Sequence, residues 1–234
     1  MPFQGFTTEA LQFLHDLREH NDRDWFAPRK PFYETEVKAP MIQLIQQVAA
    51  ACQKKGFPLF PKEPSPVSRI YRDIRFSPDK RPFHHHVGAV LHGRAGPTPF
   101  GELYLHVSPE QSFVAAGFYM PGTALLRLAR ARIAERPDEF EAMLKALRKK
   151  ALELSRESHL KRMPRGFERF ADSAIADHLK LSSFVVSRML EPDEVATPRV
   201  ARICADFALA ARPLLEWGWS LGYRPAARRE SDLA

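Results

Sequence analysis

The sequence predicts an α+β fold: a mainly antiparallel sheet of four to five strands, with helices N- and C-terminal to it packed on the sheet. In the first third of the chain and beyond residue 121, apolar residues recur at intervals of three and four, the spacing of one helix face. Between residues 67 and 121 the pattern changes to alternation, which is typical of strands. The links between the alternating segments are short, and short links join only antiparallel neighbours.

The N-terminal third is predicted to be helical. Thr7 or Thr8 can cap a helix with one apolar face, formed by Ala10, Phe13, Leu14 and Leu17. Pro40 is well placed in the first turn of a later helix, which Gly56 ends. Four prolines within residues 58–66 then predict a connector without regular structure.

The predicted strands follow this connector. They are residues 67–76, 83–92, 101–108 and 112–121, with residues 182–188 as a candidate fifth strand. Helices return over residues 122–158, and Thr197 with Pro198 begins a last helix that Pro213 is expected to kink or end. We interpret residues 1–223 as a single α+β domain and residues 224–234 as a polar C-terminal tail.

Charge is unevenly distributed along the chain. The formal net charge is +7, and residues 122–170 hold thirteen Lys and Arg residues against seven Asp and Glu residues. A localised excess of this kind favours an anionic partner, although charged helix faces are often only solvated surface. No apolar stretch of the sequence is long enough to cross a bilayer, and its first residues lack the pattern of a secretory signal, so we expect none. Cys52 and Cys204 lie in apolar patterns, so we expect buried thiols and a cytoplasmic protein.

The segment RIYRDIRF, residues 69–76, is the most unusual part of the sequence. If it is a strand, alternation places Arg72 in the same row as Ile70 and Ile74, which face the core. A buried guanidinium must be paired. Two partners stay open: an acidic side chain of the protein, or the carboxylate or phosphate of a bound ligand.

Several strings carry a family resemblance. They are NDRDWFAPRKPFYE, RIYRDIRFSPDKRPF, HVGAVL, ELYLHVSPEQSFVAAGFYMP, LKRMPRGF and LKLSSFVVSR, in this order. Together they resemble a widespread bacterial family catalogued as domain of unknown function 2461, over roughly residues 5–215. The resemblance implies no activity or cofactor, so the cofactor is unknown. It does imply motif positions, which are Asn21, Arg23, Trp25, Phe26, Arg69, Tyr71, Arg72, Asp73, Arg75, Phe76, Lys80, His86, His106, Tyr119, Pro164 and Gly166.

Histidines and one aspartate are the candidate catalytic groups. Asp73 with His86 or His106 would supply acid–base chemistry if neighbouring strands bring them together. His84 and His86 share a strand face, as metal-binding pairs do, and Glu102 or His106 would be a third ligand. Only His86 of the triplet is a motif position, and we predict no metal site. The chain has no nucleophile elbow and no glycine-rich phosphate loop.

The leading hypothesis is a cleft that binds a small anionic ligand carrying a phosphate or carboxylate, with or without hydrolase or transferase chemistry. Its candidate ligand-binding residues are Arg69, Arg72, Arg75, Lys80, Tyr119, Arg162 and Arg165. The last two belong to a basic loop that Pro164 stiffens. The alternatives are a nucleic-acid-associated basic protein, although no reading motif is present, and a non-catalytic interaction module. Whether the protein is an enzyme and its oligomeric state stay open.

Overall fold

The computed structural model describes residues 2–61, 64–93 and 101–222. Within these ranges the helical elements are α1 (Thr8–Glu19), α2 (Arg23–Phe26), η1 (Ala27–Arg29), α3 (Lys30–Phe32), η2 (Tyr33–Lys38), α4 (Ala39–Lys54), α5 (Thr123–Glu135), α6 (Pro137–Arg148), η3 (Glu168–Phe170), α7 (Ala176–Leu179), α8 (Pro192–Val195) and α9 (Arg199–Trp219). The strands are β1 (Phe60–Pro61), β2 (Val87–His92), β3 (Glu102–Val107), β4 (Ser112–Phe118) and β5 (Phe184–Leu190).

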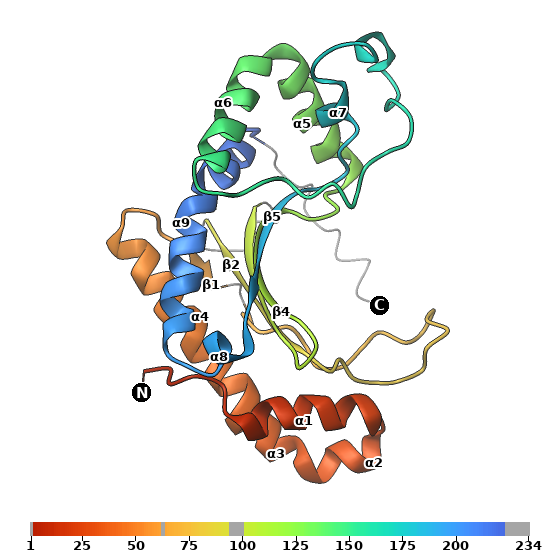
Figure 1. The fold of residues 1–234 in the computed structure, drawn as a ribbon. Coiled ribbons are helices and arrows are strands. Elements are labelled where there is room, and N and C mark those ends of the chain that lie inside the picture. Colours follow the sequence, from red (N-terminus) through yellow and green to blue (C-terminus); the bar gives the residue numbers. More distant parts are fainter. Residues whose placement is uncertain (1, 62–63, 94–100, 223–234) are drawn as a thin grey trace.

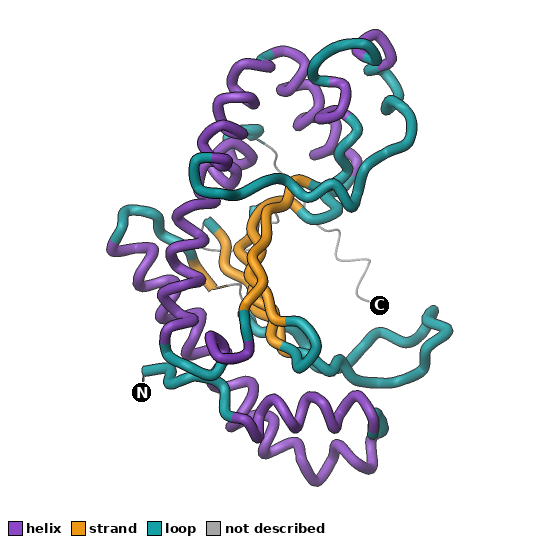
Figure 2. The backbone as a smooth tube through the Cα atoms, viewed as in Figure 1, coloured by secondary structure: helices purple, strands orange, loops and turns teal. Residues whose placement is uncertain are grey.

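Within the described residues, the five strands form one sheet in the order β1-β2-β3-β4-β5, and every neighbouring pair is antiparallel. The predicted α+β class, the antiparallel sheet and the fifth strand from the C-terminal half are therefore confirmed. Figure 2 shows the strands as one twisted layer between two groups of helices.

One face of the sheet is buried and the other is not covered by a described helix. The long helices α4 and α9 pack side by side and cover the buried face (Figure 1). Strand β3 shows the division, because Leu103, Leu105 and Val107 are buried whereas Tyr104 and His106 are only half-buried. We call the second face the open face; the central strands present Gly88, Tyr104, His106, Phe113 and Ala115 on it.

Two helical groups lie at opposite ends of the sheet. At one end α5, α6 and α7 form a lobe that is tied to the sheet by ring contacts of Phe140 with Phe184 and Trp217, whose centroids lie 6.2 and 5.0 Å from that of Phe140. At the other end α1–α3 pack through Phe26, whose ring centroid is 4.3 Å from that of Phe83. The structure is therefore curved around the open face (Figure 1).

The prediction of a strand over residues 67–76 is wrong. This segment makes only the isolated bridges Val67–Ala89 and Tyr71–Phe83, and the chain from residue 68 to residue 86 forms a long loop. Asp73 and Asp79 each accept a hydrogen bond from the backbone N–H two residues later, that of Arg75 and Arg81, and such bonds favour local turns over a strand. The predicted strand 83–92 begins only at Val87, and the proline-rich connector contributes the short strand β1.

Of the two expected effects of Pro213, kinking or ending the last helix, the second is wrong, because α9 continues through it to Trp219. Leu214, Leu215 and Trp217 are all buried beyond the proline. Their burial stabilises the last turns more than the missing backbone hydrogen bond weakens them. The predicted tail 224–234 lies outside the described residues.

Gly117 in β4 gives a direct test of the β4–β5 pairing. It has a φ of +133°, and a Cβ there would lie 2.0 Å from the carbonyl oxygen of Phe184. We expect Gly117→Ala to lower the free energy of unfolding by about 2 kcal/mol or more. Gly122→Ala is the control, since nothing lies within 4 Å of its added Cβ, and it should cost less than about 1 kcal/mol. Equal urea midpoints for the two variants would contradict this strand register.

Candidate functional site

The most distinctive polar group on the open face is a set of four histidines, His84, His85, His86 and His106, which we call the histidine cluster. The first three lie in the loop immediately before β2, and His106 lies near the end of β3. Antiparallel pairing of β2 with β3 places Gly88 opposite His106. The loop histidines therefore meet His106 because the strand after them is its direct neighbour.

Ring contacts define the geometry of the histidine cluster. The centroids of His86 and His106 lie 4.3 Å apart, and those of His84 and His86 lie 4.9 Å apart. His106 also stacks on Phe113 of β4, with centroids 4.7 Å apart and ring planes 12° apart. The rings of His86 and His106 are therefore packed between His84 of the loop and the ring of Phe113.

Tyr104 orients His106. Its hydroxyl lies 3.1 Å from Nδ1 of His106 in a hydrogen bond whose donor depends on the imidazole tautomer. The tyrosine ring lies over Gly88, where a Cβ would come within 2.5 Å of the hydroxyl oxygen. Glycine at position 88 therefore gives Tyr104 the space to reach His106.

Burial keeps His86 and His106 uncharged at neutral pH. It lowers the pKa of His86 from 6.5 to about 3, and the nearby His106, His84 and His85 lower it further. Burial also lowers the pKa of His106 to about 4, with His85 and His84 acting in the same direction and Glu110 opposing them. The pKa of His84 is lowered by burial and by the charge of Arg72. At neutral pH these imidazoles are neutral, so each has one nitrogen that donates and one that accepts.

Arg72 lies beside the histidine cluster and is paired within the protein. Its Nη1 donates to Oδ2 of Asp79 at 2.8 Å and to the carbonyl oxygen of Arg81 at 2.9 Å. Asp79 also accepts from Arg81, and hydrogen bonds from Arg81 and then Arg72 hold its pKa below the usual range. The sequence left open whether Arg72 pairs with an acidic side chain or with a bound ligand. In the structure it pairs with the acidic side chain of Asp79.

The other loop residues of the predicted site are more exposed. Arg75 pairs with Asp73 at 2.8 Å, and hydrogen bonds from Arg75 lower the pKa of Asp73 to about 2. Lys80 donates to the carbonyl oxygen of Ile74, and Arg69 is exposed. Among the contacts of the described residues, none joins Asp73 to His86 or His106. The structure thus brings His86 and His106 together, whereas Asp73 pairs with Arg75.

The remaining predicted ligand-binding residues lie elsewhere. Arg162 and Arg165 are exposed on the loop that follows α6, and Tyr119, at the end of β4, is 75% exposed. In Figure 1 the loop with Arg72 and the loop after α6 extend from opposite ends of the sheet. The predicted anion-binding residues therefore form two groups, and only the first adjoins the histidine cluster.

Several arginines of the basic segment 122–170, which is described throughout, have structural roles. Arg130 is buried and donates to the carbonyl oxygens of Leu179 and Leu181. Arg132 and Arg136 both pair with Glu139, and Arg148 pairs with Glu141. These arginines therefore have partners within the lobe, but Glu139 and Glu141 are already among the seven acids of the segment, so its excess of six positive charges remains.

In the part of the chain that the structure describes, no group of three or more His, Cys, Asp or Glu side chains is arranged to hold a metal ion. Glu102, the acid considered as a third ligand, lies 3.8 Å from His92 at the other end of β2. No described helix combines the length and the apolar character that a membrane span requires.

Sequence reasoning missed Tyr104, Phe113, Asp79 and Gly88. The alternation of ELYLHVS carried a usable signal, because it places Tyr104 two residues before His106 on the same strand face. No periodicity marks Asp79 as the partner of Arg72, since both lie in an irregular loop. That pairing is visible only in the structure.

The fold and site together define an α+β protein with a one-sidedly packed antiparallel sheet that carries neutral histidines on its open face. The chain belongs to the family described as conserved hypothetical protein (DUF2461), whose model matches residues 9–217. The resemblance seen in the sequence is thereby confirmed. Comparison with curated proteins gives no match, and neither does comparison with solved structures.

The depressed histidine pKa values predict a specific pH dependence of stability. The folded values of His86 and His106 lie below the ordinary value of 6.5, so the unfolded chain binds more protons between about pH 6.5 and 4. The free energy of unfolding should therefore fall as the pH drops through this window, by roughly 1 kcal/mol per pH unit for each histidine. Urea unfolding at half-unit pH intervals measures this slope.

The double variant His86→Gln/His106→Gln serves as the comparison, because glutamine keeps hydrogen-bonding capacity without titrating. We expect it to lose clearly less stability on acidification than the wild type, with each single variant in between. An unchanged slope in the double variant would show that other groups cause the acid sensitivity.

Proposed function

We propose that this protein binds a small anionic ligand, bearing a phosphate or a carboxylate, at the histidine cluster on the open face. The observation that carries the proposal is the close packing of His86 and His106, two half-buried rings with centroids 4.3 Å apart. Both are neutral because burial and neighbouring histidines penalise a charge. A bound anion would reverse that penalty, since an opposite charge favours the protonated imidazole.

The atoms of the histidine cluster suit an anion. Nδ1 of His106 is engaged by Tyr104, so its Nε2 is the nitrogen available to a ligand. A neutral imidazole offers one N–H, and proton uptake adds a second donor. Arg72 lies close enough to lower the pKa of His84 and contributes positive potential. Its pairing with Asp79 also means that the partly exposed arginine has a partner without a ligand.

Binding is better supported than acid–base catalysis. An effective general base has a pKa near the working pH. The pKa of His106 is about 4 and that of Asp73 about 2, so both are weak bases at neutral pH. Hydrolase or transferase chemistry would need the ligand itself to raise these values. We also place the protein in a reducing compartment, the cytosol, because Cys52 and Cys204 are buried free thiols.

Thermal unfolding with phosphate, pyrophosphate and malonate, at constant ionic strength from pH 5.5 to 8, tests the proposal. A ligand at a hundred times its Kd stabilises the folded protein by about 2.7 kcal/mol. We expect the stabilisation to increase as the pH falls, because protonated histidines bind the anion more tightly.

His86→Gln and His106→Gln should each lose most of this effect, whereas His15→Gln, an exposed position on α1, should keep it. The proposal fails if no anion stabilises the wild type at any pH, or if the two cluster variants respond like the wild type. A single-stranded oligonucleotide that binds all four proteins equally would favour the nucleic-acid alternative instead.

A further inference from the structure

A second region with ligand-binding character lies in the helical lobe, away from the histidine cluster. It is a pocket of about 150 Å³ between α6, α7 and the segment of residues 152–159. Its apolar lining consists of Leu144, Leu147, Leu152, Leu154 and Leu181. Charged residues and histidines complete the lining, so the leucines form an apolar part of the pocket that can receive a small aliphatic group.

Most charged groups around the pocket already have partners. Arg148 pairs with Glu141 on its own helix. Asp177 lies 3.7 Å from Lys180, and its carbonyl oxygen is 3.2 Å from Nε2 of His159. These side chains are therefore held by the protein and do not require a ligand.

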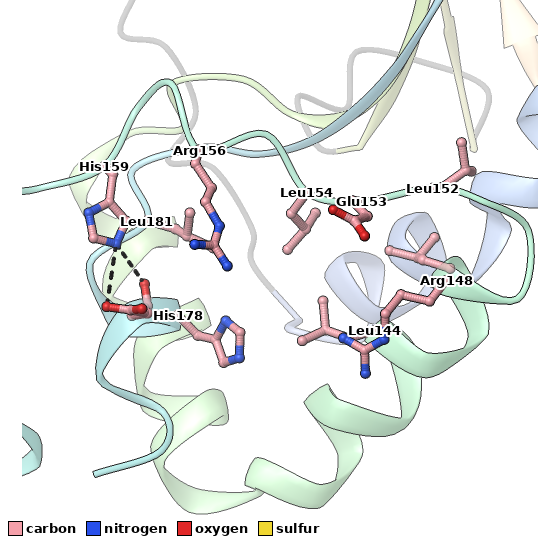
Figure 3. Close-up of a pocket in the computed structure, with 11 residues that line it drawn as sticks. Leu144, Arg148, Leu152, Glu153, Leu154, Arg156, His159, His178 and Leu181 are labelled. Carbon is pink, nitrogen blue, oxygen red and sulfur yellow. Dashed lines mark hydrogen bonds and ion pairs between the residues drawn. The ribbon is translucent and has the colours of Figure 1, made fainter. Parts of the chain in front are cut away.

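Arg156 and Glu153 are different. Both line the pocket and both are exposed, and among the described residues neither side chain is held by a hydrogen bond or an ion pair within the protein. Figure 3 shows the two side chains extending from the same loop, on either side of Leu154, toward the space above α6 and α7. His178 lies across from Arg156, close enough that the charge of Arg156 lowers its pKa, although burial is the larger cause.

The pocket thus combines an exposed cation and an exposed anion that the protein leaves available with a row of leucines. A simple carboxylate would satisfy Arg156 but be repelled by Glu153, and a simple amine would have the opposite difficulty. A zwitterion satisfies both. Arginine binds carboxylates through paired N–H donors, and a carboxylate accepts from an ammonium group.

We propose that this pocket binds a small zwitterion with an apolar side group, the chemistry of an aliphatic α-amino acid. Arg156 binds the carboxylate, Glu153 binds the ammonium group, and the leucines receive the side group. The proposal is independent of anion binding at the histidine cluster, because the two regions share no residue.

Isothermal titration calorimetry tests the proposal with L-leucine and with two analogues, each of which lacks one of its two charged groups. We expect L-leucine to bind at least tenfold more tightly than 4-methylpentanoate, which lacks the ammonium group, and than 3-methylbutylamine, which lacks the carboxylate. Glycine, without the side group, should also bind at least tenfold more weakly than L-leucine. Arg156→Gln and Glu153→Gln should each weaken L-leucine binding about tenfold or more, because each removes one charge-assisted contact.

Lys161→Gln is the matched control, since it removes an exposed charge of the same lobe outside the pocket lining. It should bind L-leucine like the wild type, and circular dichroism should show all three variants folded. The proposal is overturned if L-leucine gives no binding up to millimolar concentration. It is also overturned if 4-methylpentanoate binds as tightly as L-leucine, or if Glu153→Gln leaves L-leucine binding unchanged.

Discussion

Packing of α9 across one face of the sheet is the interaction on which the rest of the structure depends. Gly218, in the last turn of this helix, lies directly against Phe118 of β4, where a Cβ would collide with the aromatic ring. The helix is long enough to contact β4, α4 and α6. Its buried side therefore joins the sheet to the helical lobe, and Trp217 bridges the two through Phe140 and Phe184.

This one-sided packing explains why the open face can carry polar side chains. On the face under α4 and α9 the strands present leucine, valine and alanine, which gain stability from burial. The other face receives no such helix among the described residues, so Tyr104 and His106 keep partial exposure. Their half-burial is enough to lower the pKa of His106.

The same helix supports the pocket of the lobe indirectly. It holds α6 through Phe140, and α6 provides the wall from which Leu144 and Leu147 line the pocket. Arg156 and Glu153 come from the irregular segment after α6. A rigid wall with a charged loop over it is a frequent arrangement for ligand binding, because the scaffold positions the loop.

The sequence was sufficient for the elements with clear periodicity. The helix faces of α1 and α4 and the strands β3, β4 and β5 follow from spacings of three to four and of two, which burial enforces directly. RIYRDIRF alternates equally well, yet it is a loop, in which the backbone N–H of Arg75 donates to the carboxylate of Asp73 two residues before it. Periodicity alone does not distinguish those two outcomes.

The site was predictable only in part. The sequence predicted a buried Arg72 from strand alternation, but residues 69–76 form a loop and the Arg72 side chain is 22% exposed. Its partner Asp79 depends on the path of that loop. His86 and His106 meet because His86 directly precedes β2 and His106 lies in the neighbouring strand β3. The loop after α6, which carries Arg162 and Arg165, extends from the other end of the sheet (Figure 1). The sequence of a long loop has no periodicity from which its path can be predicted, so the separation of these two loops could not be foreseen.

Titration of the individual imidazoles by nitrogen–proton correlation NMR tests the central claim most directly. His86 and His106, assigned through the His→Gln variants, should both be neutral at pH 5.5, with midpoints well below the ordinary value of about 6.5. Phosphate should move both midpoints upward, since a bound anion favours the charged form. Midpoints near 6.5 that phosphate leaves unchanged would contradict both the packed, neutral histidine pair and its proposed role in binding an anion.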